Sequence, residues 1–165
     1  MTTGRAAPEG VTIRPATPAD ADTIARFNLL LAEESERRFL DPGVVARGVA
    51  LLFEDPERAR YWVAEADGGI VGQCMVTTEW SDWNNGRYWW LQSVYVAPAW
   101  RGRGILRALW DRVVADARAL GDVASIRLYV DRHNKGARDA YARLGMAETP
   151  YLVYEAPIAP GEPAS

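Results

Sequence analysis

The sequence predicts a mixed α/β fold, with helices flanking a central sheet that is mixed but mostly antiparallel. Three β-forming runs, joined by turns of sequence D-G-G at 67–69 and N-N-G at 84–86, predict an antiparallel meander. A later strand-helix-strand run over 88–130 predicts two parallel strands joined by a crossover helix. The expected order of elements is β-α-α-β-β-β-α-β-α-β.

One strand and two helices are expected before the meander. The run at 11–16 alternates apolar and polar residues, which predicts the first strand. Thr17 and Asp20 have the spacing of a capping box around Pro18, so a helix should begin there. Its apolar stripe consists of Ile24, Phe27, Leu30 and Leu31. After a Pro-Gly break, the run at 44–53 predicts a second, shorter helix.

Two helices and two strands are expected after the meander. The helix that follows Arg101 should end at Gly121. Its apolar face consists of Ile105, Leu109, Val113, Ala117 and Leu120. A strand over 125–130, a helix over 134–145 and a final strand over 149–156 complete the prediction.

Length and composition favour one globular domain. A chain of 165 residues buries roughly 70% of the surface that it exposes when unfolded. Its 48% hydrophobic and 25% charged residues argue against general disorder. We expect a single domain over 11–157, between tails at 1–10 and 158–165 that are rich in Pro and Gly and therefore flexible.

Charge and cysteine content exclude several classes of function. A net charge of -3 and a pI of about 5.3 provide no basic field for a nucleic acid. No apolar run approaches the ~20 residues that span a bilayer, and no leader pattern opens the chain, so we expect a cytoplasmic protein without a membrane partner. The single Cys74 can form neither an internal disulfide nor a thiolate metal cluster, and we expect a buried neutral thiol.

An Arg/Gly cluster, R-G-R-G at 101–104, separates a predicted strand from the crossover helix. Backbone N–H groups at a helix start lack partners and favour anions, and Gly102 and Gly104 let an anion approach closely. Arg101 and Arg103 add positive charge beside them. Taken alone, the cluster is more typical of a turn with solvated arginines. RNA binding by an Arg-Gly pair is a third interpretation, which the acidic pI disfavours.

In its context, the cluster closely resembles the acetyl-CoA pyrophosphate loop of the GNAT family of N-acetyltransferases, whose motif is Q/R-x-x-G-x-G/A. Arg101 matches its first position and Gly104 its fourth, whereas Leu106 stands where the family has Gly or Ala. The run LYVDRHNKGARDAYARLGMAE resembles the second signature of the family, with Asn134 and Tyr141 at its two functional positions. The resemblance covers residues 11 to 155 and implies the GNAT fold.

The resemblance implies direct transfer of an acetyl group from acetyl-CoA to an amine, with CoA as product and no metal. It implies that Tyr141 is the general acid for the departing thiolate. It also implies a set of cofactor-binding residues. Within this set, the strand segment 94–96 pairs with the pantetheine arm and supplies backbone N–H donors to the oxyanion. This set is Val94, Tyr95, Val96, Arg101, Gly102, Arg103, Gly104, Ile105, Leu106, Arg107 and Asn134.

The amine must lose its proton, because an alkylammonium of pKa ~10.4 is neutral in only about one molecule in 2,500 at pH 7. The sequence is most similar to the polyamine branch of the family, the spermidine/spermine and thialysine N-acetyltransferases. In that branch the Glu of an E-D-x-x-V strand is taken as the base. Here the corresponding position is Gln92, whose amide cannot act as a base. We expect Glu79, then Asp82, or an ordered water to replace it, although both carboxylates are equally typical of a solvated hairpin.

Other polar and aromatic residues are candidates for the acceptor site. Glu33 and Glu34 lie at the end of the first helix and would attract a polycation, although pairing with nearby arginines explains them equally well. Trp80 and Trp83 flank a turn and are placed to hold an alkylammonium by cation–π contact, and Gln92 is a further substrate contact.

We therefore expect an N-acetyltransferase that acts on a small-molecule amine, either a polyamine, a diamine or an amino-acid-like amine. Acetylation of protein N-termini or lysines is the alternative within enzymes. A non-catalytic acyl-CoA-binding or sensing domain is the alternative from another class. The strand at 149–156 is a plausible edge for a homodimer.

Overall fold

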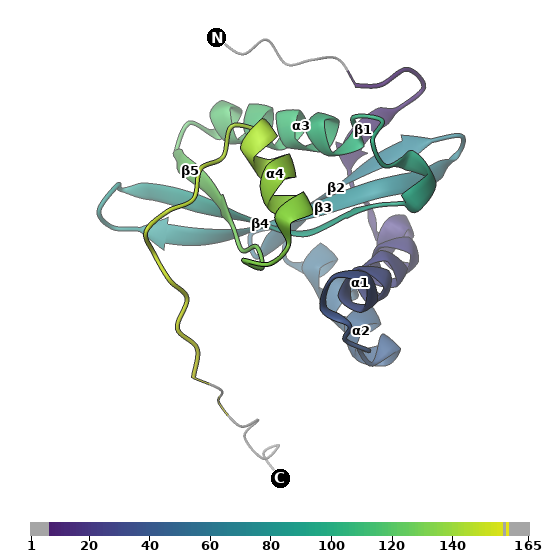
Figure 1. The fold of residues 1–165 in the computed structure, drawn as a ribbon, viewed down its shortest axis with the longest axis horizontal. Coiled ribbons are helices and arrows are strands. Elements are labelled where there is room, and N and C mark those ends of the chain that lie inside the picture. The colour runs from purple at the N-terminus through teal and green to yellow at the C-terminus, as the bar shows by residue number, and fades with distance from the viewer. Residues whose placement is uncertain (1–6, 157, 159–165) are drawn as a thin grey trace. The chain divides into compact units, whose positions relative to one another are not determined.

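A five-stranded mixed sheet is the centre of the larger of two compact units, one reaching to Asp131 and the other starting at Arg132 (Figure 1). The structure is a computed structural model that describes residues 7–156 and residue 158. The strands lie in the sheet in chain order. They are β1 Thr12–Pro15, β2 Ala59–Ala66, β3 Gly69–Ser81, β4 Gly86–Val96 and β5 Val123–Leu128.

The strand directions confirm the predicted meander and crossover. Strands β1 to β4 pair antiparallel, whereas β4 and β5 pair parallel. The turn between β2 and β3 has Asp67 at φ 51° and Gly68 at φ 74°. Two adjacent left-handed residues match the right-handed twist of a hairpin, so this turn sets the β2/β3 register.

Three α-helices and two short 3-10 turns complete this unit: η1 Pro18–Asp20, α1 Ala21–Glu36, α2 Pro42–Glu54, η2 Pro98–Trp100 and α3 Ile105–Leu120. The predicted capping residues start the first helical segment, where Asp20 accepts hydrogen bonds from the backbone N–H and the hydroxyl of Thr17 at 2.7 and 3.1 Å. Helix α2 begins at Pro42, two residues before the predicted start, because Asp41 caps it by accepting the Val44 N–H at 2.8 Å.

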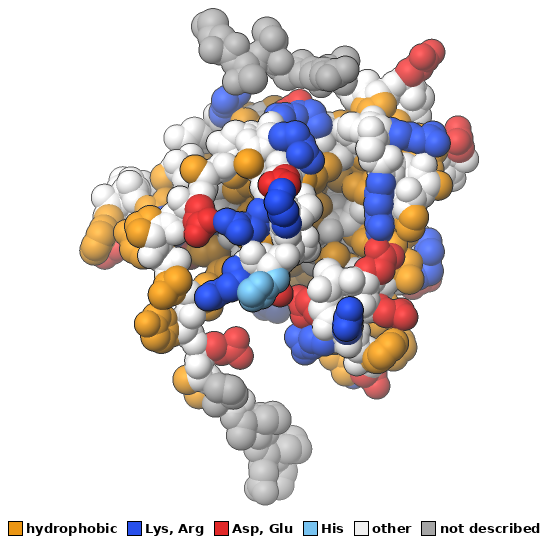
Figure 2. Space-filling model, viewed as in Figure 1, with side chains coloured by type: hydrophobic (Ala, Val, Ile, Leu, Met, Phe, Trp, Pro, Cys, Tyr) orange, Lys and Arg blue, Asp and Glu red, His pale blue; other side chains and the backbone are white. Residues whose placement is uncertain are grey.

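Side chains that alternate along the strands form two cores on opposite faces of the sheet. On one face, α3 packs over strand residues that include Trp62 and Trp89. On the other face, α1 and α2 pack over Tyr61, Val63 and Met75. Acidic and basic side chains lie next to one another over α1 and α2 in Figure 2, so this surface carries no patch of a single sign.

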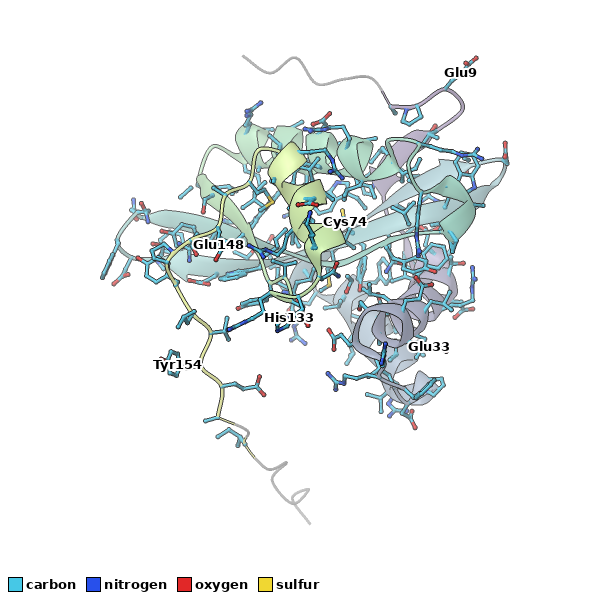
Figure 3. All side chains as sticks on the ribbon, in the orientation of Figure 1. Glu9, Glu33, Cys74, His133, Glu148 and Tyr154 are labelled. Carbon is cyan, nitrogen blue, oxygen red and sulfur yellow. The ribbon has the colours of Figure 1, made fainter. Side chains whose placement is uncertain are left out.

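The apolar face of α3 is confirmed, since Ile105, Leu109, Val113 and Ala117 are buried. Leu120 is 42% exposed, and the helix then ends at Gly121 with φ 77°. Cys74 lies in β3 within the sheet (Figure 3), and burial raises its pKa to about 12. The predicted buried, neutral thiol is therefore confirmed.

The second unit contains α4, Lys135–Arg143. Asn134 caps it by accepting the Ala137 N–H at 3.0 Å, and Gly145, at φ 90°, follows its end. An ion pair of 2.8 Å joins Arg138 to Glu148 beyond the helix.

The predicted final strand over 149–156 is wrong, because these residues contain no strand. The apolar side chains of residues 151–154 are 69 to 91% exposed, and Tyr154 projects from this segment in Figure 3. High β propensity reflects packing on a half-buried sheet surface and cannot by itself supply a pairing partner. Of the two predicted tails, only residues 7–10 and 158 belong to the described ranges.

Candidate active site

A β-bulge at Ser93 redirects the end of β4. The register passes from Met75 opposite Gln92 to Gln73 opposite Tyr95, so two residues of β4 face one residue of β3. Ser93 has φ 49°, a left-handed conformation that is uncommon outside glycine. Bulges bend a strand and re-aim the residues that follow, here 94–96.

A buried polar network surrounds this bulge. Gln73, fully buried in β3, donates from Nε2 to the Ser93 carbonyl at 3.3 Å and to Asn28 Oδ1 of α1 at 2.7 Å. Asn28 in turn donates to the Tyr61 hydroxyl of β2 at 3.1 Å, and that hydroxyl also bonds the Ser93 side chain. Burial is the main cause that raises the Tyr61 pKa, so the phenol stays protonated. Residues of three other elements, α1, β2 and β3, thus hold Ser93 in its strained conformation.

None of the residues of this network is among the site residues predicted from the sequence. The residues of the network are far apart in the chain, and only one of them is unusual in its local sequence. Gln73 is a lone amide in the run IVGQCMV, which is otherwise suited to a buried strand. A buried polar side chain needs hydrogen-bond partners, so this position pointed to a network without naming its other members.

Strands β4 and β5 separate just before the bulge. The parallel pairing runs from Arg87 to Leu91, whereas β4 remains paired with β3 as far as Val96. Val94, Tyr95 and Val96, the segment predicted to hold the thioester, therefore lie beyond the β4/β5 ladder. Tyr95 is buried and packs against Phe27 of α1, with ring centroids 4.8 Å apart.

The Arg/Gly loop connects this strand segment to α3. Gly102 and Gly104 have φ of 75° and 88°. A Cβ at Gly102 would meet no described atom within 4 Å, so backbone conformation rather than space requires glycine there. The first intrahelical bond joins the Ala108 N–H to the Gly104 carbonyl, so the amides of 105–107 precede it. Such amides form an anion site at a helix start.

The arginines of the loop have different surroundings. Arg101 Nε donates to the Val96 carbonyl at 2.8 Å, and its Nη2 lies 2.6 Å from Glu34. Arg103 stacks over Trp100, with 5.1 Å from Cζ to the ring centroid. The Arg101 guanidinium is the main cause that lowers the pKa of Glu34, so this carboxylate stays ionised. Arg101 is thus held in place by protein groups.

The first turn of α3 contains the other residues of the predicted cofactor set. Ile105 is buried in the core, whereas Leu106 and Arg107 are half-buried. Arg107 lies 3.9 Å from Asp111, one turn further along the helix. Leu106, where the motif has Gly or Ala, lies in the first turn of α3.

A cavity of about 390 Å³ opens between α1, α2 and the sheet beside the bulge. This volume falls within the range of roughly 300–1,000 Å³ of small-molecule sites. Asn28, Tyr61 and Ser93 provide polar groups to its lining. Because Ser93 directly precedes Val94, the cavity adjoins the strand segment predicted to hold the thioester.

The predicted substrate-binding residues lie outside this lining. Glu33 is exposed at the end of α1 in Figure 3, and Glu34 is bound to Arg101. Trp80 and Trp83, 59% and 92% exposed, lie at the distant end of the β3–β4 hairpin. Gln92 donates to Thr77 Oγ1 at 2.7 Å across the same two strands.

The two candidate bases also lie at the distant end of the hairpin. Glu79 faces Tyr88 in the register and accepts a hydrogen bond from Trp90 Nε1 at 2.5 Å. Val94 follows Tyr88 by six positions, which is about 20 Å along a strand. Asp82, in the hairpin turn, accepts the Trp83 N–H at 3.0 Å. The structure therefore does not bring either carboxylate to the segment predicted to hold the thioester.

Asn134 and Tyr141 lie in the second unit, where Asn134 caps α4 and Tyr141 is half-buried on that helix. Their predicted roles toward acetyl-CoA stay predictions. Within the described residues, no three His, Cys, Asp or Glu side chains form a group that would hold a metal ion. No described helix has both the length and the apolarity required to cross a membrane.

Comparison with known proteins agrees with this geometry. Residues 26–146 match the acetyltransferase (GNAT) family. An aminoglycoside N(6')-acetyltransferase type 1 from Stenotrophomonas maltophilia is 34% identical over 149 residues, 87% of this chain and 90% of the relative. The crystal structure of a possible acetyltransferase from Clostridium difficile 630 is 38% identical, with a TM-score of 0.86 over 92% of this chain and 99% of that one.

A third similar protein shows the same fold at lower identity. It is a predicted acetyltransferase from Clostridium acetobutylicum, solved with acetyl-CoA, with a TM-score of 0.73 and 20% identity over 88% of this chain and 96% of that one. The bulged strand, the glycine loop at the helix start and the family match agree with one another. The chain therefore belongs to the GNAT acetyltransferase family and is an N-acetyltransferase.

Proposed function

We propose that this enzyme transfers the acetyl group of acetyl-CoA to a primary amine of a small molecule that binds in the cavity beside the β4 bulge. One observation carries the proposal: the strand segment 94–96, beyond the β4/β5 ladder, adjoins both the glycine loop and the cavity. No described strand pairs with this segment on the β5 side, which suits the pantetheine arm, and the amides at the start of α3 suit the pyrophosphate. A similar structure solved with acetyl-CoA supports this donor.

The reaction is a direct acyl transfer. The neutral amine attacks the thioester carbonyl carbon, and backbone N–H groups of the segment 94–96 stabilise the oxyanion that forms. The C–S bond then breaks, and the CoA thiolate takes a proton from Tyr141, which regains it from solvent. The attacking nitrogen releases its own proton to water, because Gln92 is a neutral amide and Glu79 is remote.

Cavity size favours a small acceptor over a protein. The similarity to an aminoglycoside acetyltransferase supports amines carried by small molecules as a class. Polyamines, diamines and amino-acid-like amines belong to that class. Protein acetylation and a non-catalytic acyl-CoA sensor are the competing functions.

An amine panel tests the proposal, with thiol release from acetyl-CoA followed by a thiol reagent. Cys74 is buried and its pKa is raised to about 12, so it contributes little background. We expect steady turnover with at least one free amine, above the rate with peptides. Calorimetric binding of acetyl-CoA without turnover on any amine would support the sensor instead, and faster acetylation of peptides would support a protein substrate.

A further inference from the structure

The cavity beside the bulge has mostly apolar walls. They consist largely of Leu31, Val45, Val49, Leu52 and Met75. A ligand in this cavity would therefore replace water mainly with hydrocarbon contacts.

The two charged side chains in the described lining, Glu36 and Arg38, form an ion pair with each other. The carboxylate of Glu36 lies 3.4 Å from the guanidinium of Arg38. Glu34, which the sequence predicts as a polycation contact, instead accepts hydrogen bonds from Arg101 and Tyr95. A second or third ammonium group would therefore enter the cavity without a partner, which is costly in apolar surroundings.

Three uncharged polar residues of the lining lie at the bulge, next to the strand segment 94–96. Asn28, Tyr61 and Ser93 belong to the network that holds the bulge, and Val94 follows directly. An amine placed here would lie beside the thioester while its carbon skeleton contacts the apolar walls. Desolvation by these walls lowers the pKa of an alkylammonium and so increases its neutral, nucleophilic fraction. This effect partly offsets the lack of a base at Gln92.

We infer, resting on the proposed function, that the acceptor is a primary amine on an uncharged apolar body, such as an alkylamine or an arylalkylamine, rather than a polyamine or an aminoglycoside. The inference combines the apolar walls, the ion pair between Glu36 and Arg38, and the uncharged polar side chains of Asn28, Tyr61 and Ser93 beside the bulge.

Matched acceptors test the inference. Hexylamine and 1,6-diaminohexane have the same chain and differ by one ammonium group, and phenethylamine, spermidine and kanamycin extend the comparison. We expect kcat/KM to be about tenfold or more higher for hexylamine than for 1,6-diaminohexane, because the second charge loses its hydration without gaining a partner. An equal or higher kcat/KM for 1,6-diaminohexane, spermidine or kanamycin would overturn the inference and leave the proposed function intact. Absence of turnover with every amine would overturn the proposed function itself.

A pair of neighbouring substitutions links the preference to the cavity. Leu52 lines it, whereas Leu51, 50% exposed on the same helix, does not. Leu52→Glu should lower kcat/KM for hexylamine about tenfold and raise the relative rate with 1,6-diaminohexane. Leu51→Glu should change neither value. Equal behaviour of the two variants would contradict the inference, and Leu40→Glu in the loop before α2 gives the same test if Leu52→Glu fails to fold.

Discussion

Glu34 Oε2 lies 2.6 Å from Arg101 Nη2, so an ion pair joins the end of α1 to the glycine loop. Glu34 Oε1 also accepts the hydroxyl of Tyr95 at 2.9 Å, and Arg101 Nε donates to the carbonyl of Val96. The pair therefore connects α1, which lines the proposed acceptor cavity, with the strand segment 94–96 and the glycine loop. Its side chains are 39% and 48% exposed, so it contributes at most about 1 kcal/mol to stability, and we expect its role to be positional.

Substitution of Glu34 tests this role. Glu34→Gln should raise the KM for acetyl-CoA roughly three- to tenfold with little change in thermal stability, because Arg101 loses the charge that orients it. Glu33→Gln, an adjacent exposed carboxylate, is the matched control and should behave like the native enzyme. A double-mutant cycle with Arg101→Ala should be non-additive. Additive effects on KM would show that the two residues act independently.

Two substitutions at Ser93 test the role of the β4 bulge. Glycine adopts the left-handed conformation freely, whereas a β-branched residue does so only with strain. Ser93→Val should lower kcat roughly a hundredfold and destabilise the protein by about 1–3 kcal/mol. Ser93→Gly keeps the backbone and loses only the hydroxyl bond to Tyr61, so it should keep most of the activity. Kinetics and urea unfolding measure both effects, and equal loss of kcat in the two variants would assign the effect to the hydroxyl instead.

Local patterns suffice to predict most of this fold. Turn residues such as Gly68 and helix caps such as Asn134 act within a few positions of the chain, so the sequence predicts the hairpins and helices well. The strand expected at 149–156 shows the limit of such reasoning. Its β propensity is high, yet a strand also needs a partner, and no local pattern specifies one.

The candidate site also contains parts that local sequence predicts and parts that it does not. The strand segment 94–96 and the glycine loop are contiguous, so a motif predicts both. Asn28 and Gln73 meet only when α1 packs against the sheet, 45 residues apart in the chain. Glu34 and Arg101 are 67 residues apart. The local sequence around Glu34 does not show whether this carboxylate binds a substrate or pairs with an arginine of the glycine loop. Glu79 is misleading in the opposite way. It lies in the hairpin that contains the segment 94–96, but it faces Tyr88 at the far end of that hairpin.

Substitution of Tyr141 tests its predicted role as the general acid. Tyr141→Phe should lower kcat by roughly 10²- to 10⁴-fold, because the CoA thiolate would depart without a proton donor. The matched control is Tyr154→Phe, since Tyr154 is 91% exposed and should leave kcat unchanged. Circular dichroism checks that both variants fold. Unchanged turnover in Tyr141→Phe would remove this residue from the mechanism.

A partly buried ion pair between Arg14 and Asp20, before α1, should make stability depend on pH. Asp20 accepts two hydrogen bonds from Arg14, at 2.7 and 3.0 Å, and this guanidinium is the main cause that lowers the pKa of Asp20 to about 2. An unfolded aspartate titrates near ~3.9. Because the folded value is the lower one, the stabilisation is fully present above about pH 5 and is lost as the pH falls toward 2.

Urea unfolding over a pH series measures this contribution. Asp20→Asn should be less stable than the native protein by about 2 kcal/mol at pH 7, and the difference should shrink progressively between about pH 5 and pH 2. Asp22→Asn, an exposed neighbour in the first turn of α1, should keep the native pH profile. A difference between Asp20→Asn and the native protein that stays constant with pH would mean that packing or helix capping, rather than ionisation beside Arg14, accounts for the loss.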